Sequence, residues 1–223
     1  MEFQDFLAPP SPSPFSLGDI LPKHMLKQIL SFGTILFLLI SCSENFKKLP
    51  EKYRDDEYLL KQIIPNSKIE YWQVDYVNGF TPNKIFSSGN QELSKKLPLP
   101  ENQNLDGFFT GCQPLYCNYR ILYISNNKWN FVQDKDELKK FIGKIDNEYE
   151  AFLIARINDF DIDSNSKGNG FEKTKYGYKL KVMIYNSCPE TKQSYIVTVD
   201  ENGKLNKLKN LGFYLKSKNC IVY

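Results

Sequence analysis

The chain has 223 residues, and its 29 basic and 26 acidic side chains give a formal net charge of only +3. This charge is too small to indicate nucleic-acid binding, and the three arginines, Arg54, Arg120 and Arg156, are few for a protein that reads phosphates or bases. The length of residues 42–223 fits one domain with a hydrophobic core of its own.

The first 41 residues have the pattern of an export signal. Residues 1–24 include the proline-rich stretch Ala8–Pro14, which predicts a disordered leader or a start codon set upstream of the true start at Met25. The apolar run Ile29–Ile40 has 12 residues, whereas a membrane-spanning helix needs about 20. With Lys27 before it and Ser41 after it, this run predicts a signal peptide over residues 25–41.

Leu39-Ile40-Ser41-Cys42 resembles the lipobox of bacterial lipoproteins. The resemblance implies that Cys42 is lipid-modified, that it is the first residue of the mature protein, and that it anchors the chain to a membrane. Residues 42–50, polar from Ser43 to Lys48, are then expected to form a tether. The alternative is an ordinary signal peptide, or an uncleaved apolar helix, followed by a coincidental cysteine.

The resemblance also bears on location. Ser43 stands where an aspartate can retain lipoproteins at the inner membrane, so the cell envelope, and its outer membrane in particular, is the expected location. The abundance of Lys, Asn and Ile resembles that of envelope lipoproteins of Bacteroidota.

Residues 51–223 are predicted to form a single α+β domain with a mainly antiparallel sheet and a few short helices. In the first half, Pro50 and the spacing of apolar residues up to Ile64 predict a helix, and alternation over Lys68–Val77 predicts a strand. Residues 78–109 have loop signals with one helical turn near 91–96.

The second half is more regular. Strands are predicted at 116–124 and 129–132, and Asp134 with Glu137 predicts a capped helix that ends at Gly143. Residues 151–157 are apolar up to Arg156, which favours a central strand over an amphipathic helix. Alternation then predicts strands at 178–185, 194–199 and 205–215.

Four cysteines follow Cys42. Outside the cytoplasm an even number of cysteines indicates disulfides, here with three possible connectivities. Gly111 and Pro114 predict a turn that favours pairing of the two near cysteines, which leaves the other two as a pair. The alternatives are free thiols or a zinc site, although no cysteine spacing fits the latter. The candidates are Cys112 with Cys117 and Cys188 with Cys220.

The only histidine, His24, precedes Met25, so the mature chain is expected to lack histidine-based catalysis and histidine metal ligands. One segment has the spacing of an EF-hand calcium loop, with oxygen ligands at its first, third, fifth and twelfth places. Ser166 replaces the usual turn glycine, so a polar loop without an ion is the alternative. The candidate calcium ligands are Asp161, Asp163, Asn165 and Glu172.

An aromatic cluster could stack on sugars, although alternation along a strand favours core packing for its rings. It consists of Tyr71, Trp72, Tyr76 and Phe80. The sequence therefore predicts a lipid-anchored envelope protein that binds or scaffolds. The alternative is a glycan-binding or glycan-active protein that uses Asp159, Asp161 or Glu172 near exposed aromatic rings.

Overall fold

The computed structural model describes residues 45–65, 68–100, 104–112 and 116–221. The predicted leader, the signal peptide and Cys42 lie outside these residues. Residues 45–223 form one compact unit. It is an α+β domain with two antiparallel sheets and four short α-helices, so the predicted fold class is confirmed.

The first sheet has five strands in the order β2-β1-β4-β3, with β5 also pairing with β4. Residues 117–119 of β4 pair with β3 and residues 121–125 pair with β5, so these two strands share one edge of β4. The strands are β1 (Tyr71–Asn78), β2 (Thr81–Gly89), β3 (Phe108–Gly111), β4 (Cys117–Ser125) and β5 (Lys128–Val132).

The second sheet is a four-stranded meander in the order β6-β7-β8-β9. Its long hairpins join neighbouring segments of sequence, as the alternation over 178–215 predicts. The strands are β6 (Gly170–Thr174), β7 (Gly177–Ser187), β8 (Glu190–Asp200) and β9 (Leu205–Lys216).

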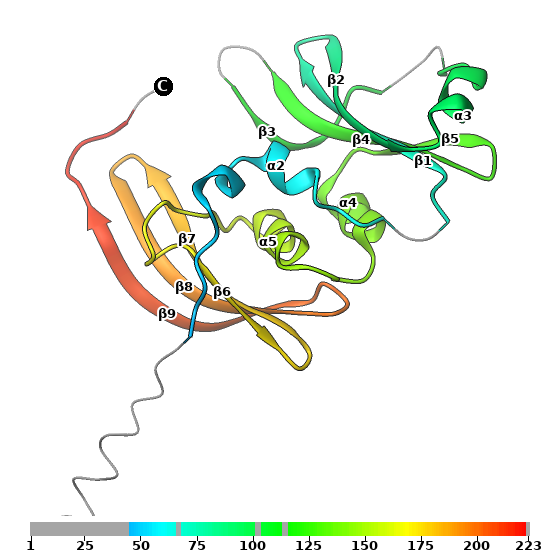
Figure 1. Cartoon of the computed structure of the whole chain (residues 1–223). Coiled ribbons are helices and arrows are strands. Elements are labelled where there is room, and N and C mark those ends of the chain that lie inside the picture. The colour runs from blue at the N-terminus through cyan, green and yellow to red at the C-terminus, as the bar shows by residue number, and fades with distance from the viewer. Residues whose placement is uncertain (1–44, 66–67, 101–103, 113–115, 222–223) are drawn as a thin grey trace, which may run out of the picture. The chain divides into compact units, whose positions relative to one another are not determined.

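Helices α2 (Asp56–Leu60), α4 (Lys135–Ile142) and α5 (Glu148–Ile157) lie between the two sheets (Figure 1). Phe141 of α4 packs against Trp72 of β1 and Tyr123 of β4, and α5 packs on β7 and β8. Residues from both sheets and all three helices join one hydrophobic core. Burial of apolar side chains in this middle layer is the main stabilising contribution to the fold.

The prediction for the segment 151–157 is wrong: it belongs to helix α5 and not to a central strand. Asn147 accepts a hydrogen bond from the Glu150 amide while the Glu150 carboxylate accepts one from the Asn147 amide, a capping box that starts the helix. The run is apolar because α5 is buried between α2, α4 and the second sheet, and periodicity cannot separate such a helix from a buried strand.

Two further segments differ from the sequence predictions. Within the predicted loop over 78–109, residues 81–89 form strand β2, which is followed by helix α3 (Gln91–Lys96), expected as a single turn. The predicted helix over 50–64 is split into a short 3₁₀ helix, η2 (Glu51–Arg54), and α2. Strand β2 escaped prediction because it is an edge strand with mostly exposed residues and Pro82, so no apolar alternation marks it.

The first described residues are already part of the domain. Lys47 pairs with Phe171 at the edge of β6 through two backbone hydrogen bonds of 2.8 and 2.7 Å. Leu49 is buried, and its backbone exchanges two hydrogen bonds with the amide side chain of Asn169. Residues 45–50, which the sequence analysis assigns to the tether, therefore belong to the folded unit.

Among the described residues, the helices are all too short or too polar for a membrane-spanning segment.

Candidate functional site

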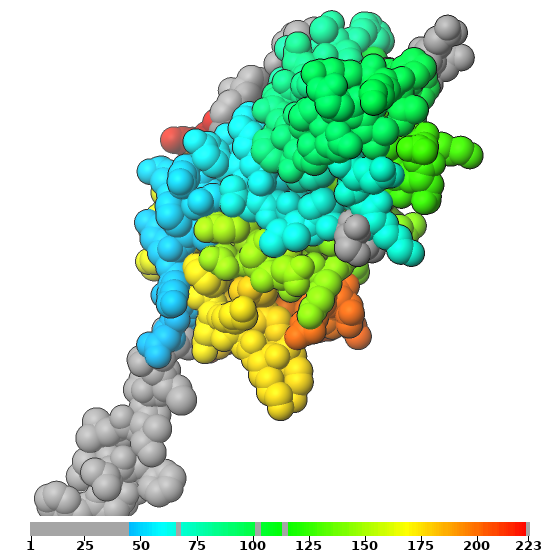
Figure 2. All heavy atoms as spheres, turned by 45° about the vertical axis from the view of Figure 1, so that its right-hand side comes forward, coloured from blue at the N-terminus to red at the C-terminus, as the bar shows by residue number. Residues whose placement is uncertain are grey.

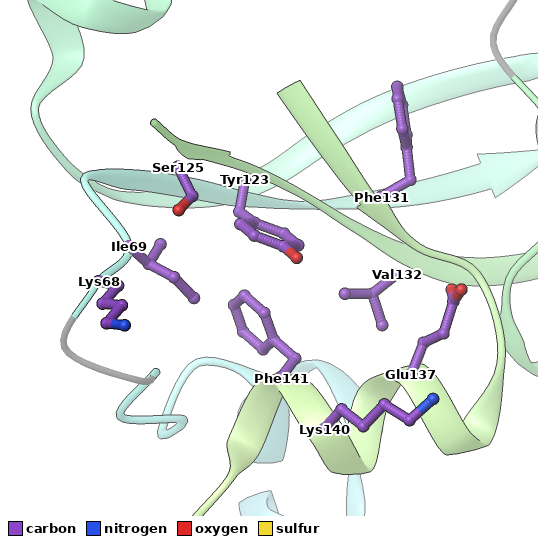
Figure 3. A pocket seen from close by; sticks show the side chains of 9 residues that line it. All are labelled: Lys68, Ile69, Tyr123, Ser125, Phe131, Val132, Glu137, Lys140 and Phe141. Carbon is purple, nitrogen blue, oxygen red and sulfur yellow. The ribbon is translucent and has the colours of Figure 1, made fainter. Parts of the chain in front are cut away.

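A pocket with aromatic walls lies between α4 and strands β4 and β5, and we call it the aromatic pocket. It has a volume of about 350 Å³. Figure 3 shows the rings of Tyr123 and Phe141 facing each other at its centre, while Phe131 points away from them. Nine residues line it: Lys68, Ile69, Tyr123, Ser125, Phe131, Val132, Glu137, Lys140 and Phe141.

The walls of the aromatic pocket are formed by elements that the sequence predicts. Residues Tyr123 and Val132 lie on the helix-facing side of β4 and β5, and Asp134 caps α4 so that Phe141 reaches the same space. Lys68 and Lys140 add positive charge at the rim, and the Glu137 carboxylate is held by the Gln133 amide at 2.8 Å. A pocket with apolar rings and a few polar groups suits a small ligand with a flat or apolar part.

A second, larger opening, which we call the charged cleft, has a volume of about 730 Å³. It lies where β3, the start of α4 and the end of α5 meet. Its lining combines four aspartates, two basic residues and aromatic rings. The residues used below are Asp56, Phe109, Lys135, Arg156, Asp159 and Asp161.

Arg156 is the centre of the charged cleft. Its guanidinium binds Asp56 through two hydrogen bonds of 2.8 and 2.7 Å and contacts Asp161 at 2.6 Å. The same group lies 5.7 Å from the centre of the Phe109 ring. Burial raises the pKa of Asp56 above its ordinary value, and the contact with Arg156 offsets this only in part.

Asp159 is placed by the end of α5. It has a φ of 63°, and the amides of Asp159 and Phe160 bind the carbonyls of Arg156 and Ala155. This is a Schellman motif with an aspartate where glycine is usual, a substitution that aspartate tolerates well. Asp159 then forms an ion pair of 2.5 Å with Lys135.

The aspartates of the charged cleft are thus engaged. Three of them contact Arg156 or Lys135, and Asp134 caps α4 through the Glu137 amide. A carboxylate held by a neighbouring cation favours hydrogen bonding to a ligand over proton transfer. The arrangement therefore suits recognition of a polar molecule.

The candidate calcium ligands are each engaged elsewhere. Asp161 contacts Arg156, the Asn165 side chain accepts from the Lys167 amide, and Glu172 lies 4.0 Å from Lys179. Over the described part of the chain, no three Asp, Glu, His or Cys side chains come together as a group that could hold a metal ion. The calcium site stays a prediction of the sequence pattern.

Asp163, the remaining candidate, is a buried residue of the loop that joins α5 to β6. Its carboxylate accepts hydrogen bonds from Tyr214 at 2.6 Å and from Lys192 at 3.1 Å. Burial by itself would raise the pKa of Asp163, but these two contacts outweigh it and leave the pKa below its ordinary value. Asp163 thus fixes this loop on the outer face of the second sheet.

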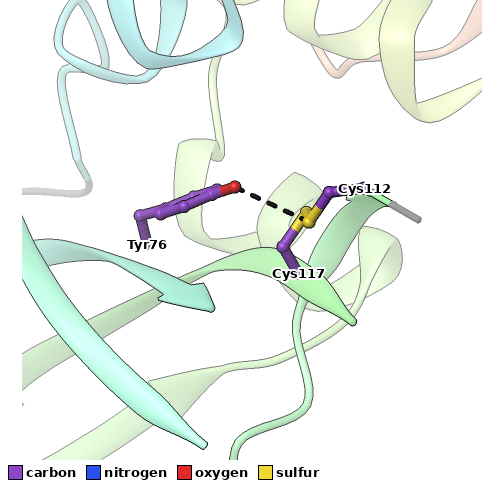
Figure 4. The surroundings of a disulfide bond; sticks show 3 residues. All are labelled: Tyr76, Cys112 and Cys117. Carbon is purple, nitrogen blue, oxygen red and sulfur yellow. Dashed lines mark hydrogen bonds between the residues drawn. A yellow bond between two sulfur atoms is a disulfide. The ribbon is translucent and has the colours of Figure 1, made fainter. Parts of the chain in front are cut away.

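Both predicted disulfide pairings are confirmed. Cys112 and Cys117 join the end of β3 to the start of β4, with the Tyr76 hydroxyl 3.7 Å from the Cys112 sulfur (Figure 4). Cys188 and Cys220 join the β7–β8 turn to the segment that follows β9. Each sheet therefore has one covalent crosslink near its edge.

The predicted aromatic cluster does not form a platform. Tyr71 and Trp72 are buried, which confirms core packing for these two rings, whereas Phe80 is 92% exposed beside the β1–β2 turn. The residues that do form the pockets, above all Tyr123, Phe141 and Arg156, were not identified as site residues. Only the packing of three distant segments brings them together, so a single sequence has no signal for them.

Comparison with protein-family models, curated proteins and solved structures gives no significant match for this chain.

Proposed function

We propose that this chain is a lipid-anchored protein of the bacterial cell envelope, at the outer membrane, whose domain acts by binding and not by catalysis. The lipobox and the place where the domain begins carry this proposal. Lys47 already pairs with β6, so only a few residues separate Cys42 from the folded unit. The two disulfides agree with an extracytoplasmic location, because disulfides persist in oxidising compartments.

The aromatic pocket supports the binding role. It presents aromatic side chains with lysines at the rim, a combination that favours a ligand with a flat apolar part and a negative group. Three aspartates of the charged cleft are paired with Arg156 or Lys135, which favours binding of a polar ligand over proton transfer. A binding domain held at a membrane is the function that fits both features.

The intact mass of the protein purified from its native membranes tests the anchor. We expect the mass of residues 42–223 plus a diacylglyceryl group and an acyl chain, less four hydrogens for two disulfides. The variant Cys42→Ala should lose the lipid mass and leave the membrane fraction. An unlipidated mass that includes His24 would contradict the proposal.

A glycan is the second candidate ligand, and the charged cleft favours it. The cleft brings Asp159 and Asp161, both expected from the sequence, beside the Phe109 ring, whereas Glu172 lies elsewhere on β6. Carboxylates and an aromatic ring are groups that hydrogen-bond and stack on sugars.

A glycan panel tests this candidate. The wild-type protein should bind at least one glycan class, and Asp159→Asn should weaken that binding about tenfold, the effect of one charge-assisted hydrogen bond. Asp136→Asn, an exposed change in the first turn of α4 outside the cleft, is the matched control. Equal, flat responses over the whole panel would remove the glycan candidate.

A further inference from the structure

The chain joins the domain on the outer face of the second sheet, the face turned away from α5. Phe46 lies against Gly170 of β6, and the ammonium groups of Lys179 and Lys181 lie 5.2 and 4.5 Å from its ring centre. In Figure 2 the first described residues, in blue, run beside the yellow residues of β6 and β7. The part of the domain nearest to Cys42 is therefore this face.

We call this surface the basic face and define it by Lys167, Lys179, Lys181, Lys209 and Leu211. Lys181 and Lys209 share this side of the sheet because both pair with Ile196 of β8. Lys167, Lys181 and Leu211 also line one pocket of about 280 Å³. The surface thus combines lysines with an exposed apolar side chain around a shallow hollow.

The positive charge of the basic face is only partly neutralised by the protein itself. Among the described residues, Lys167, Lys181 and Lys209 form no ion pair with an acidic side chain. The buried Asp163 on this side is already bound by Lys192 and Tyr214, and Glu172 lies 4.0 Å from Lys179. The face therefore attracts an anionic surface.

The connection to Cys42 is short. Cys42 and Asn45 are three residues apart, so even a fully extended chain reaches only about 11 Å. This is close to the Debye length of about 8 Å at physiological ionic strength, so the charge of the leaflet acts on the part of the domain that follows the tether. Leu211, 40% exposed, is of a residue type that enters the headgroup region.

We propose that the basic face lies against the anionic phospholipid headgroups of the leaflet that holds Cys42, with Leu211 at the headgroup boundary. This inference rests on the proposed lipid anchor. It orients the domain, because the charged cleft and the aromatic pocket belong to other surfaces and stay open to ligands. The phosphates are the partner, and the lysines are the groups that recognise them.

The test uses the lipidated protein in nanodiscs of anionic or zwitterionic phospholipid. A water-soluble amine-reactive reagent labels exposed lysines, and peptide mass spectrometry measures the rate at each site. We expect Lys167, Lys181 and Lys209 to react at least about threefold more slowly in anionic discs, and 1 M salt to remove the protection. Lys84, Lys96 and Lys128 of the first sheet region are internal controls whose rates should not change.

A pair of matched variants sharpens the result. Lys181→Gln with Lys209→Gln should return Lys167 to its unprotected rate, whereas Lys84→Gln with Lys128→Gln, the same change in net charge, should leave Lys167 protected. Equal labelling of the basic face in both lipids would overturn the inference. The intact mass of the same sample shows whether the anchor is present, so failure of the orientation is distinguished from failure of the lipid anchor.

Discussion

The outer faces of the two sheets are covered by other segments of the chain to different extents. On the first sheet the chain covers its own outer face, since the segment after α3 accepts hydrogen bonds from Trp129 at the Leu97 carbonyl and from Arg120 at the Asn104 carbonyl. On the second sheet the loop around Asp163 covers part of the outer face and buries Met183, and the rest of this face carries lysines beside Leu211. The first face is interior, whereas the second has an uncovered part that is available to something outside the chain.

The covered face contains an almost fully buried ion pair. Arg120 donates to Asp75 at 3.1 and 3.3 Å, Gln73 donates to the other oxygen of Asp75 at 2.7 Å, and the Tyr71 hydroxyl donates to Gln73 at 2.9 Å. A buried charge is tolerated only with such partners. The comparison teaches that charge on the first sheet serves internal pairing, whereas the second sheet has one internal pair, Asp163 with Lys192, and further lysines that are left for solvent or a partner.

The largest expected effect is on the covered face. Arg120→Met leaves the Asp75 carboxylate buried without its cation, so we expect the free energy of unfolding to fall by about 3–5 kcal/mol. Urea unfolding followed by circular dichroism measures it. The double variant Arg120→Met with Asp75→Leu should recover part of the loss. A loss under 1 kcal/mol in the single variant would contradict the view that the first sheet depends on this internal charge pair.

One disulfide lies in each sheet, so the two disulfides allow a second comparison of the same two regions. In a chain-entropy account, the 32-residue separation of Cys188 and Cys220 contributes about 3.5 kcal/mol, whereas the separation of 5 between Cys112 and Cys117 contributes about 2 kcal/mol. Removing each pair by double Ser substitution and measuring unfolding in urea should show the larger loss for Cys188 and Cys220. The opposite order would show that local packing, not loop length, decides their contributions.

The next largest expected loss of stability is at Asp163, in the loop between α5 and β6. Asp163→Asn removes the charge that Lys192 and Tyr214 bind, and we expect a loss of about 2 kcal/mol at neutral pH. The pKa of Asp163 is lower in the folded than in the unfolded state, so this stability is present above the ordinary aspartate pKa and is lost as pH falls through the folded value.

Unfolding of wild type and variant from pH 7 down to pH 2 measures this dependence. The two stabilities should converge toward the acidic end. A difference that is constant over the whole range would show that the Asp163 charge does not contribute.

The smallest expected effect is on the basic face. Lys209→Gln changes an exposed side chain without an ion partner among the described residues, so stability should change by less than about 0.5 kcal/mol. Thermal unfolding in the absence of lipid checks this. A larger loss would mean that Lys209 has a structural role and that the two faces are less different than we describe.

The sequence predicts best where structure is local. The strands β7, β8 and β9 and the capped helix α4 follow from alternation, turn residues and the Asp134 cap, all of which act within a few residues. Helix α5 was predicted as a strand because its burial depends on α2, α4 and the second sheet, which the local pattern does not contain.

The residues of the candidate sites were likewise predicted only where a local pattern marks them. The cysteine pairs were found because a turn and simple counting constrain them, and Asp159 and Asp161 were named because polar loops are visible in sequence. Arg156 and Phe109 were missed because they meet only when the end of α5 packs beside β3. No spacing along the chain carries that information.

The Asp75–Arg120 pair also specifies how the first sheet is assembled. The two residues stand directly opposite each other in the β1–β4 ladder. A slip of two residues keeps every side chain on its face but would put Asp75 opposite Asn118 or Leu122, leaving both charges buried without each other. We infer that this ion pair selects the native register of β1 and β4 during folding, since only that alignment places the two charges opposite each other.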